Sequence, residues 1–241
     1  LHDDVDTVVG HGMRHYTKEP FLIDGKLEWR EAPETSGNDD ILRKADNPFS
    51  PDGGLRLMKG NIGRGVIKVS AVREGCRIIE APAIVFNDQR EVLAAFERGE
   101  LERDFVCVVR YQGPRANGMP ELHKLTPPLG ILQDRGFKVA LLTDGRMSGA
   151  SGKVPASIHM TPEALMGGNI AKIRTGDLIR FDSVTGEINV LIDEAEWNAR
   201  EVEHIDLSAN QQGCGRELFA NFRSMTSSAE TGAMSFGGEF A

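Results

Sequence analysis

The chain has 241 residues, 40% of them hydrophobic and 27% charged, and its formal net charge is −8. This composition is typical of a globular protein, and the length allows one large domain or one domain with a smaller appendage. The acidic balance without a basic run argues against a nucleic-acid partner, and the lack of a long apolar run argues against a membrane partner.

Residues 1–50 are polar and rich in turn formers, and they begin without Met, in the manner of a segment entered in mid-course. Prolines, glycines and charges over residues 32–51 are typical of a connecting arm. The compact part of the chain is expected to begin at Gly53-Gly54-Leu55. We therefore expect an arm over residues 1–50 and a domain over residues 51–241.

Strand and helix signals alternate in the rest of the chain, which predicts an α/β, β-rich core with short helices. Apolar or β-branched runs predict strands over residues 65–72, 83–86, 104–111 and 137–143, and a hairpin over residues 177–193. The runs 104–111 and 137–143 are almost continuously apolar, so these two strands should be buried on both faces.

Helices are predicted by capping residues, by prolines in a first turn and by apolar spacing. They are expected from Asn87-Asp88 to Gly99, over residues 120–136 in two pieces broken near Pro127-Pro128, from Thr161-Pro162 onward, and over residues 194–201 and 215–225.

The three cysteines, Cys76, Cys107 and Cys214, are far apart, and no pair has the short spacing of a zinc or iron–sulfur motif. Cys107 lies in an apolar run and is expected to be a buried thiol. Free cysteines without a secretory signal indicate a reducing compartment, so we expect a cytoplasmic protein.

A glycine-rich loop follows the strand predicted over residues 137–143. It contains Asp144 and Ser148, and its backbone N–H groups could bind an anion, with Arg146 and Lys153 adding charge. The loop matches neither a nucleophile elbow nor a P-loop. From these residues alone, a plain glycine-rich turn is the favoured interpretation.

A second loop, over residues 110–124, leads into a helix that Pro120 is expected to open, which would place Glu121 in its first turn. Charge–dipole pairing is the plainer interpretation of Glu121, and binding of a hard cation is the alternative. Residues 60–65 are interpreted as a structural turn, with anion binding by Arg64 as the alternative. Three histidines without partners at ligand spacing are expected on the surface or in packing: His123, His159 and His204.

Both loops resemble the dihydroxy-acid and phosphogluconate dehydratase family. Residues 142–151, Leu-Thr-Asp-Gly-Arg-Met-Ser-Gly-Ala-Ser, look like the family's second signature, and residues 113–121 look like its Gly-Pro-…-Gly-Met-x-Glu segment. Residues 46–55, 115–124 and 213–219 look like the phosphogluconate branch of the family. The resemblance extends over essentially the whole chain.

The resemblance implies a swivelling β-barrel-like domain, similar to the carboxy-terminal domain of aconitases. It implies a hydro-lyase that converts 6-phospho-D-gluconate into 2-dehydro-3-deoxy-6-phosphogluconate and water, in the Entner–Doudoroff pathway. The arm would then connect to an amino-terminal half outside this chain, with the ligands of a [4Fe–4S] cluster and most ligands of a Mg²⁺ ion. We therefore expect the isolated chain to be inactive and the complete protein to be a homodimer.

The resemblance also implies roles for single residues. Ser148 corresponds to the family's proposed base and Glu121 to a Mg²⁺ ligand, while no cluster ligand lies in this chain. The expected substrate- or anion-binding residues are Arg146, Gly149, Ser151, Lys153 and Arg115, and the candidates for a phosphate are Arg64, Arg115 and Arg216. The alternatives are a dehydratase for another sugar acid or 2,3-dihydroxy acid, and a non-catalytic anion-binding module.

Overall fold

The computed structural model describes residues 4–148 and 152–236, and the chain divides into two compact units, Leu1–Gly53 and Gly54–Ala241. The first unit has two antiparallel pairs: β1 (Asp6–Thr7) with β2 (Gly10–His11), and β3 (Lys18–Ile23) with β4 (Lys26–Glu31). It also has a 3₁₀ turn, η1 (Met13–Tyr16). The β3–β4 hairpin was not predicted from the sequence. Asp24 and Gly25 form its turn with φ values of 48° and 76°, and positive φ at both positions is what an Asp-Gly hairpin turn requires.

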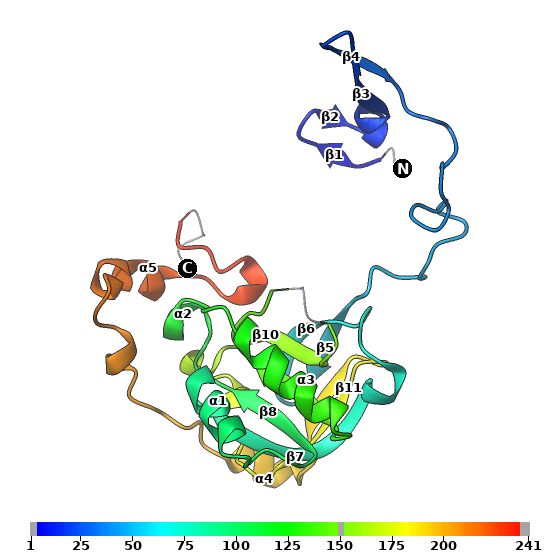
Figure 1. The fold of residues 1–241 in the computed structure, drawn as a ribbon. Coiled ribbons are helices and arrows are strands. Elements are labelled where there is room, and N and C mark those ends of the chain that lie inside the picture. Colours follow the sequence, from blue (N-terminus) through cyan, green and yellow to red (C-terminus); the bar gives the residue numbers. More distant parts are fainter. Residues whose placement is uncertain (1–3, 149–151, 237–241) are drawn as a thin grey trace. The chain divides into compact units, whose positions relative to one another are not determined.

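Eight strands of the second unit close into a barrel in the order β10-β6-β5-β12-β11-β7-β8-β9 (Figure 1). Neighbouring strands from β7 through β8 and β9 to β10 are parallel. The strands are β5 (Leu55–Gly60), β6 (Gly63–Lys68), β7 (Ile78–Phe86), β8 (Phe105–Val109), β9 (Val139–Thr143), β10 (Ala156–Thr161), β11 (Leu178–Asp182) and β12 (Glu187–Val190). The predicted β-rich, barrel-like fold with short helices is confirmed.

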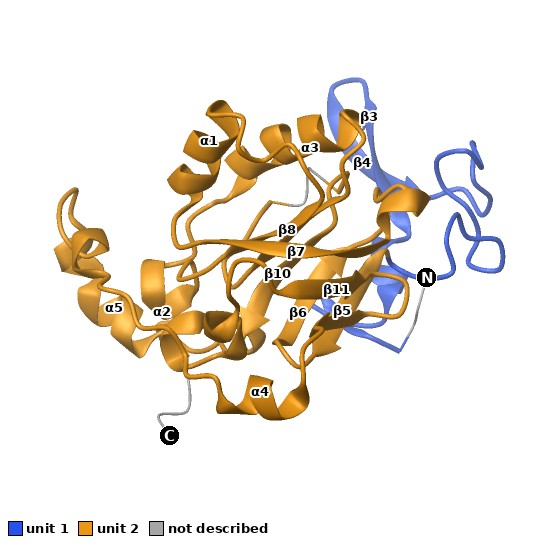
Figure 2. Cartoon of the chain, turned by 90° about the horizontal axis from the view of Figure 1, so that it is seen from below, with its two compact units in different colours: residues 1–53 blue, residues 54–241 orange. Residues whose placement is uncertain are grey.

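Two apolar clusters lie on the two faces of the parallel strands. In β8, Val106 and Val108 belong to the cluster inside the barrel, while Phe105, Cys107 and Val109 belong to a second cluster under the helices. The helices of this layer are α1 (Gln89–Glu97) and α3 (Thr126–Asp134), which lie on the same side of the barrel in Figure 2. All residues of β8 and β9 are buried, so the prediction of strands buried on both faces is confirmed.

The other helices are short. They are α2 (Pro114–Asn117), α4 (Glu194–Ala199) and α5 (Ala220–Met225), with 3₁₀ turns η2 (Glu74–Cys76), η3 (His123–Leu125), η5 (Ala164–Met166), η6 (Asn169–Lys172), η7 (Ser208–Asn210), η8 (Arg216–Phe219) and η9 (Ala229–Thr231). The predicted cap of α1 is confirmed, because the Asp88 side chain accepts the N–H of Arg90. The predicted hairpin is confirmed as β11–β12.

The helix boundaries predicted at Pro127-Pro128 and at Thr161 are wrong. Pro127 and Pro128 do not break a helix but stand in the first turn of α3, where a proline loses no hydrogen bond. Thr161 does not cap a helix but ends β10, and a short 3₁₀ turn, η5, begins after Glu163. The sequence Thr161-Pro162-Glu163, which is typical of the start of a helix, therefore stands at the end of a strand.

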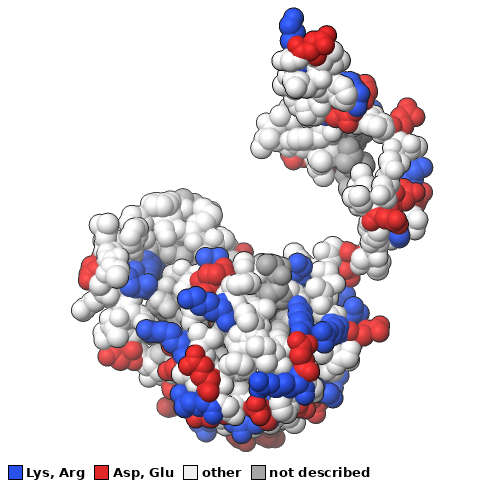
Figure 3. Space-filling view, viewed as in Figure 1, with Lys and Arg blue, Asp and Glu red and all other residues white. Residues whose placement is uncertain are grey.

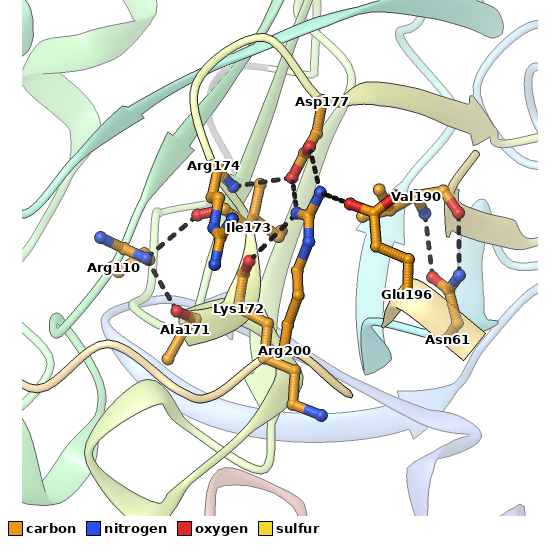
Figure 4. Close-up of polar contacts among 10 residues, drawn as sticks. All are labelled: Asn61, Arg110, Ala171, Lys172, Ile173, Arg174, Asp177, Val190, Glu196 and Arg200. Atoms are coloured by element: carbon orange, nitrogen blue, oxygen red, sulfur yellow. Dashed lines mark hydrogen bonds and ion pairs between the residues drawn. The ribbon is translucent and has the colours of Figure 1, made fainter. Parts of the chain in front are cut away.

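Buried polar side chains fasten the segments that join the strands (Figure 4). Arg110 donates from Nη1 to the carbonyls of Ala171 and Ile173, at 3.1 and 3.2 Å. Arg200 makes a two-pronged ion pair with Asp177 at 2.5 and 3.0 Å, and both side chains are less than a tenth exposed. These ties hold the segment after β10 and the end of α4 against the barrel.

Positive and negative side chains are interspersed over the second unit in the face drawn in Figure 3. The segment towards the carboxyl terminus is largely uncharged in this view. The exposed apolar side chains of this segment include Leu218, Phe219 and Phe236. In residues 4–148 and 152–236, no helix combines the length and the apolar character that crossing a membrane requires.

Candidate active site

The loops that follow β8 and β9 meet at one edge of the barrel, because the carboxyl ends of parallel strands lie at the same edge. Glu121 and Arg146 form an isolated parallel β-bridge between these loops. The N–H of Leu122 donates to the carbonyl of Arg146 at 3.1 Å. Two segments 25 residues apart are thus held side by side at the strand ends.

Asp144 anchors both loops from inside the protein. Its fully buried carboxylate accepts the backbone N–H groups of Tyr111, Gln112 and Ala164, at 3.2, 2.9 and 2.9 Å. These donors come from the segments after β8 and β10, while Asp144 itself follows β9. Burial raises the pKa of Asp144 to about 6, although the three N–H donors act in the opposite direction. One side chain therefore fixes three strand-end segments.

A second carboxylate fixes α2. Glu163 accepts the N–H groups of Arg115 and Ala116 in the first turn of this helix, at 3.0 and 3.2 Å. Burial raises the pKa of Glu163. A Cβ atom on Gly113 would lie 2.1 Å from Glu163 Oε2, so only glycine fits there. Glu163 therefore holds the start of the segment that leads to Glu121, and the β-bridge holds its end.

Glu121 does not lie in a helix, so the prediction that Pro120 opens one is wrong. Gly118 and Met119 have φ values of 70° and 51°, and this left-handed stretch ends α2 and directs the chain into the β-bridge. The Glu121 carboxylate accepts the N–H of Ser148 at 2.8 Å and makes an ion pair with Arg146 at 2.9 Å. Its position is therefore set by the loop after β9.

Ser148 is exposed, and in the part of the chain that the structure describes its hydroxyl makes no hydrogen bond. Met147 anchors the loop by packing on the cluster under the helices, and its sulfur accepts a hydrogen bond from Thr126 at 3.2 Å. With Met147 held inward, Arg146 and Ser148 are left on the outer side. A mainly apolar cavity of about 130 Å³ opens beside Ser148, between β6 and β10.

The structure brings together Glu121, Arg146 and Ser148, but not every predicted site residue. The ammonium of Lys153 pairs with Asp134 of α3 at 2.5 Å. The guanidinium of Arg115 donates to the carbonyl of Thr226 at 2.7 Å. The predicted residues Gly149 and Ser151 lie outside the described residues.

His159 adjoins the site, although the sequence indicated only a surface or packing residue. It lies at an irregularity in the β6–β10 pairing, with φ at 57°, and its N–H donates to the carbonyl of Gly145 at 2.9 Å. Partial burial and the nearby Arg146 lower the pKa of its imidazole. The sequence carries no local signal for the position of His159, because that position depends on the pairing of β10 with β6, and β10 was not predicted. Asp144 did leave a signal, as a single acid between an apolar strand and a glycine.

The described residues contain no group of three or more histidine, cysteine or acidic side chains that could hold a metal ion. Glu121 fits one ligand of a hard cation, whose remaining ligands would have to come from another segment. The free cysteines do not fit an iron–sulfur cluster, because Cys107 is buried, Cys76 is half-buried and Cys214 is exposed in separate places.

Strand-end loops that are held by a rigid barrel and carry a carboxylate, a guanidinium and a serine are a common location for an active site. Residues 40–233 match the family described as dihydroxy-acid/6-phosphogluconate dehydratase, C-terminal, and the chain belongs to this family. The resemblance seen in the sequence is confirmed.

Similar proteins include the phosphogluconate dehydratase of Pseudomonas aeruginosa, which is 64% identical over 98% of this chain, and that of Escherichia coli K12, which is 57% identical over 97%. The dihydroxy-acid dehydratase of Pyrococcus furiosus is 38% identical over 81% of the chain. The chain spans 39% of the length of the first two relatives.

Proposed function

We propose that this chain is the carboxy-terminal part of a hydro-lyase that dehydrates 6-phospho-D-gluconate to 2-dehydro-3-deoxy-6-phosphogluconate. The observation that carries the proposal is the pairing of the Glu121 carboxylate with the backbone N–H of Ser148 at 2.8 Å. It puts a carboxylate, the type of group that binds a hard cation, and a hydroxyl at one strand-end edge. The relatives named phosphogluconate dehydratase support this substrate over other sugar acids and 2,3-dihydroxy acids.

Dehydration removes the proton at C2 and the hydroxyl at C3, and the resulting enol becomes the 2-keto acid. In our proposal the Ser148 oxygen takes the C2 proton. A serine is a weak base at its ordinary pKa, so its anion needs stabilising charge and N–H donors. Arg146, paired with Glu121 at 2.9 Å, supplies the positive charge in this loop.

Two cofactors belong to the proposal. Glu121 would contribute one ligand to a Mg²⁺ ion, which when bound stabilises negative charge on the substrate carboxylate. The ligands of the [4Fe–4S] cluster are assigned to an amino-terminal part outside this chain, since the cysteines described above do not fit them. It follows that the isolated chain should be inactive. The proposal also includes a homodimer, which the family resemblance implies, and a cytoplasmic location, which the free cysteines indicate.

The amino-terminal part and the site residues that the structure leaves apart also belong to the proposal. The amino-terminal part would be the partner against which this barrel domain closes, by swivelling about the arm over residues 1–50. Arg115, Lys153, Gly149 and Ser151 remain proposed anion-binding residues. Their present partners, where described, are other side chains or backbone groups of this chain.

The test is 2-keto-acid formation by the complete protein. Ser148→Ala should lower kcat about 1,000-fold or more without a matching change in KM, because a proton-transfer group acts in the transition state. Ser224→Ala, at another exposed serine, should leave kcat unchanged. Full activity of the Ser148→Ala variant, or turnover of a 2,3-dihydroxy acid in preference to 6-phosphogluconate, would contradict the proposal.

A further inference from the structure

A second cavity, of about 170 Å³, lies next to the one that holds Ser148. The two cavities share Val66 of β6 as a common wall. The second is lined by Leu57, Arg64, Gly65, Val66, His159, Ala229 and Glu230. Its basic residues come from the barrel, and its single acid comes from the carboxy-terminal segment.

The glycines on either side of Arg64 explain its direction. A Cβ atom on Gly63 would lie 2.7 Å from the carbonyl oxygen of Thr161, and one on Gly65 would lie 2.5 Å from the sulfur of Met160. Both positions therefore face β10 at close range. Because side chains alternate along a strand, Arg64 emerges on the opposite face, towards the cavity.

The Arg64 guanidinium already binds an anionic group of this chain. Its Nη2 lies 2.5 Å from Oε2 of Glu230, a residue 166 positions further along the sequence. The two side chains are 56% and 33% exposed, so the pair is open to solvent and is worth little to stability. Arginine is suited to both carboxylate and phosphate, and a phosphate dianion carries more charge and more acceptor oxygens.

His159 adds a hydrogen-bond donor to the cavity, since even a neutral imidazole carries one N–H. Its imidazole lines the same cavity, and it lies near Arg146 of the site described above. A ligand bound by Arg64 would therefore lie beside His159 and Val66, and Val66 also lines the cavity next to Ser148.

The other two arginines that the sequence offered for a phosphate donate hydrogen bonds to neutral groups of this chain. Arg115 donates to Thr226, and Arg216 donates to Asn210 and to the side chain of Asn117. In residues 4–148 and 152–236, Arg64 is held by the Glu230 carboxylate, which a stronger anion can replace.

We propose that the cavity between β6, β10 and η9 is the subsite for the phosphate of a phosphorylated sugar acid, with Arg64 as its cation and Glu230 as the chain's own competing anion. The inference rests on the proposed function of the Ser148 site. Glu230 leaves Arg64 when the substrate binds. Removing the charge of Arg64 should therefore weaken phosphate binding, and removing the charge of Glu230 should strengthen it.

The experiment compares Arg64→Ala and Glu230→Gln in the complete protein, with KM for 6-phosphogluconate and the competitive inhibition constant of inorganic phosphate as readouts. Arg64→Ala should raise both constants about 10- to 100-fold, the value of a charged hydrogen-bonding pair. Glu230→Gln should lower both about 3- to 10-fold. Arg64→Lys, which keeps the charge and loses the planar fork, should be intermediate.

The surface pair Arg98–Glu100, joined at 2.7 Å, with side chains 58% and 52% exposed, gives the control variants Arg98→Ala and Glu100→Gln, which should change neither constant. Any other pattern overturns the inference, including equal shifts in both Arg64 and Glu230 variants or a rise in Arg64→Ala without a fall in Glu230→Gln. A wild-type protein that does not dehydrate 6-phosphogluconate overturns the proposed function itself, and this outcome is seen before any variant is made.

Discussion

The Glu121 carboxylate accepts the backbone N–H of Ser148 at 2.8 Å, so a side chain from the loop after β8 fixes the loop after β9. The same carboxylate pairs with Arg146 and accepts the N–H of His123 at 3.0 Å. A proposed metal ligand and a proposed base are therefore mechanically coupled. Losing the Glu121 carboxylate should therefore displace the backbone at Ser148.

This coupling predicts different outcomes for two substitutions of Glu121. Glu121→Gln keeps an oxygen that can accept the Ser148 N–H, and it should weaken activation by Mg²⁺ at least about 10-fold, because a neutral amide is a poorer ligand than a carboxylate. Glu121→Ala loses the acceptor as well, and its kcat at saturating Mg²⁺ should fall further. Mg²⁺ titrations of turnover after chelation would show this. Equal kcat for the two variants at saturating Mg²⁺ would contradict the coupling.

The loop after β9 should not tolerate a methyl group at Gly145. A Cβ atom there would lie 2.8 Å from Cβ of Gln112 and 2.9 Å from Cδ1 of Leu122, the neighbour of Glu121. We expect Gly145→Ala to lower kcat about 10-fold or more and to cost roughly 1–3 kcal/mol of stability, as overpacking does. Gly75→Ala is the matched control, because a Cβ atom at Gly75 meets nothing within 4 Å. Normal turnover in Gly145→Ala would show that the loop can shift without loss.

Asp144 should make stability depend on pH. Burial raises the pKa of Asp144 from 3.8 to about 6 in the folded state. Between these values the folded state binds more protons than the unfolded state, so this residue's contribution to stability is present below pH 3.8 and is lost as the pH rises through about 6. The loss is about 3 kcal/mol. Asp144→Asn cannot titrate, so the wild type should lose this much relative to the variant between pH 4 and 7. Denaturant unfolding across this range measures the difference, and parallel curves would refute the prediction.

The ion pair between Asp177 and Arg200 should contribute strongly to the stability of the folded state. The two side chains are 9% and 8% exposed, and hydrogen bonds to Asp177 and Glu196 raise the pKa of Arg200. Asp177→Ala leaves a buried guanidinium without its main partner, which should cost about 3–5 kcal/mol. Glu196→Ala removes the exposed partner, and should cost less than about 1 kcal/mol. Equal losses in chemical denaturation would contradict the assignment.

The cysteines should differ sharply in reactivity. Full burial raises the pKa of the Cys107 thiol, so it forms little thiolate near neutral pH. Cys214 is exposed. In native protein a thiol reagent should label Cys214 within minutes and leave Cys107 unmodified until the protein is unfolded, as peptide mass mapping would show. Labelling of native Cys107 at a similar rate would contradict the packing of β8.

Some parts of the fold could be predicted because their signals are local. An unbroken apolar run fixes β8 and β9 as strands buried on both faces, whatever their neighbours are. The Asp88 cap of α1 likewise depends on residues two positions apart. The predictions at Pro120 and Thr161 are wrong because tertiary contacts overrode a local helix signal. At Pro120 the contact is the β-bridge of Glu121, and at Thr161 it is the pairing of β10 with β6.

The family, the buried strands and the residue types at the strand ends could be predicted from the sequence alone, since contiguous motifs encode them. The sequence could not determine which side chains meet. Glu121 contacts Arg146 and Ser148, and Arg64 contacts Glu230, only because the barrel places the loops after β8 and β9, and the β6 and η9 segments, side by side. Strand order and pairing arise from packing between distant segments, and no local pattern encodes them.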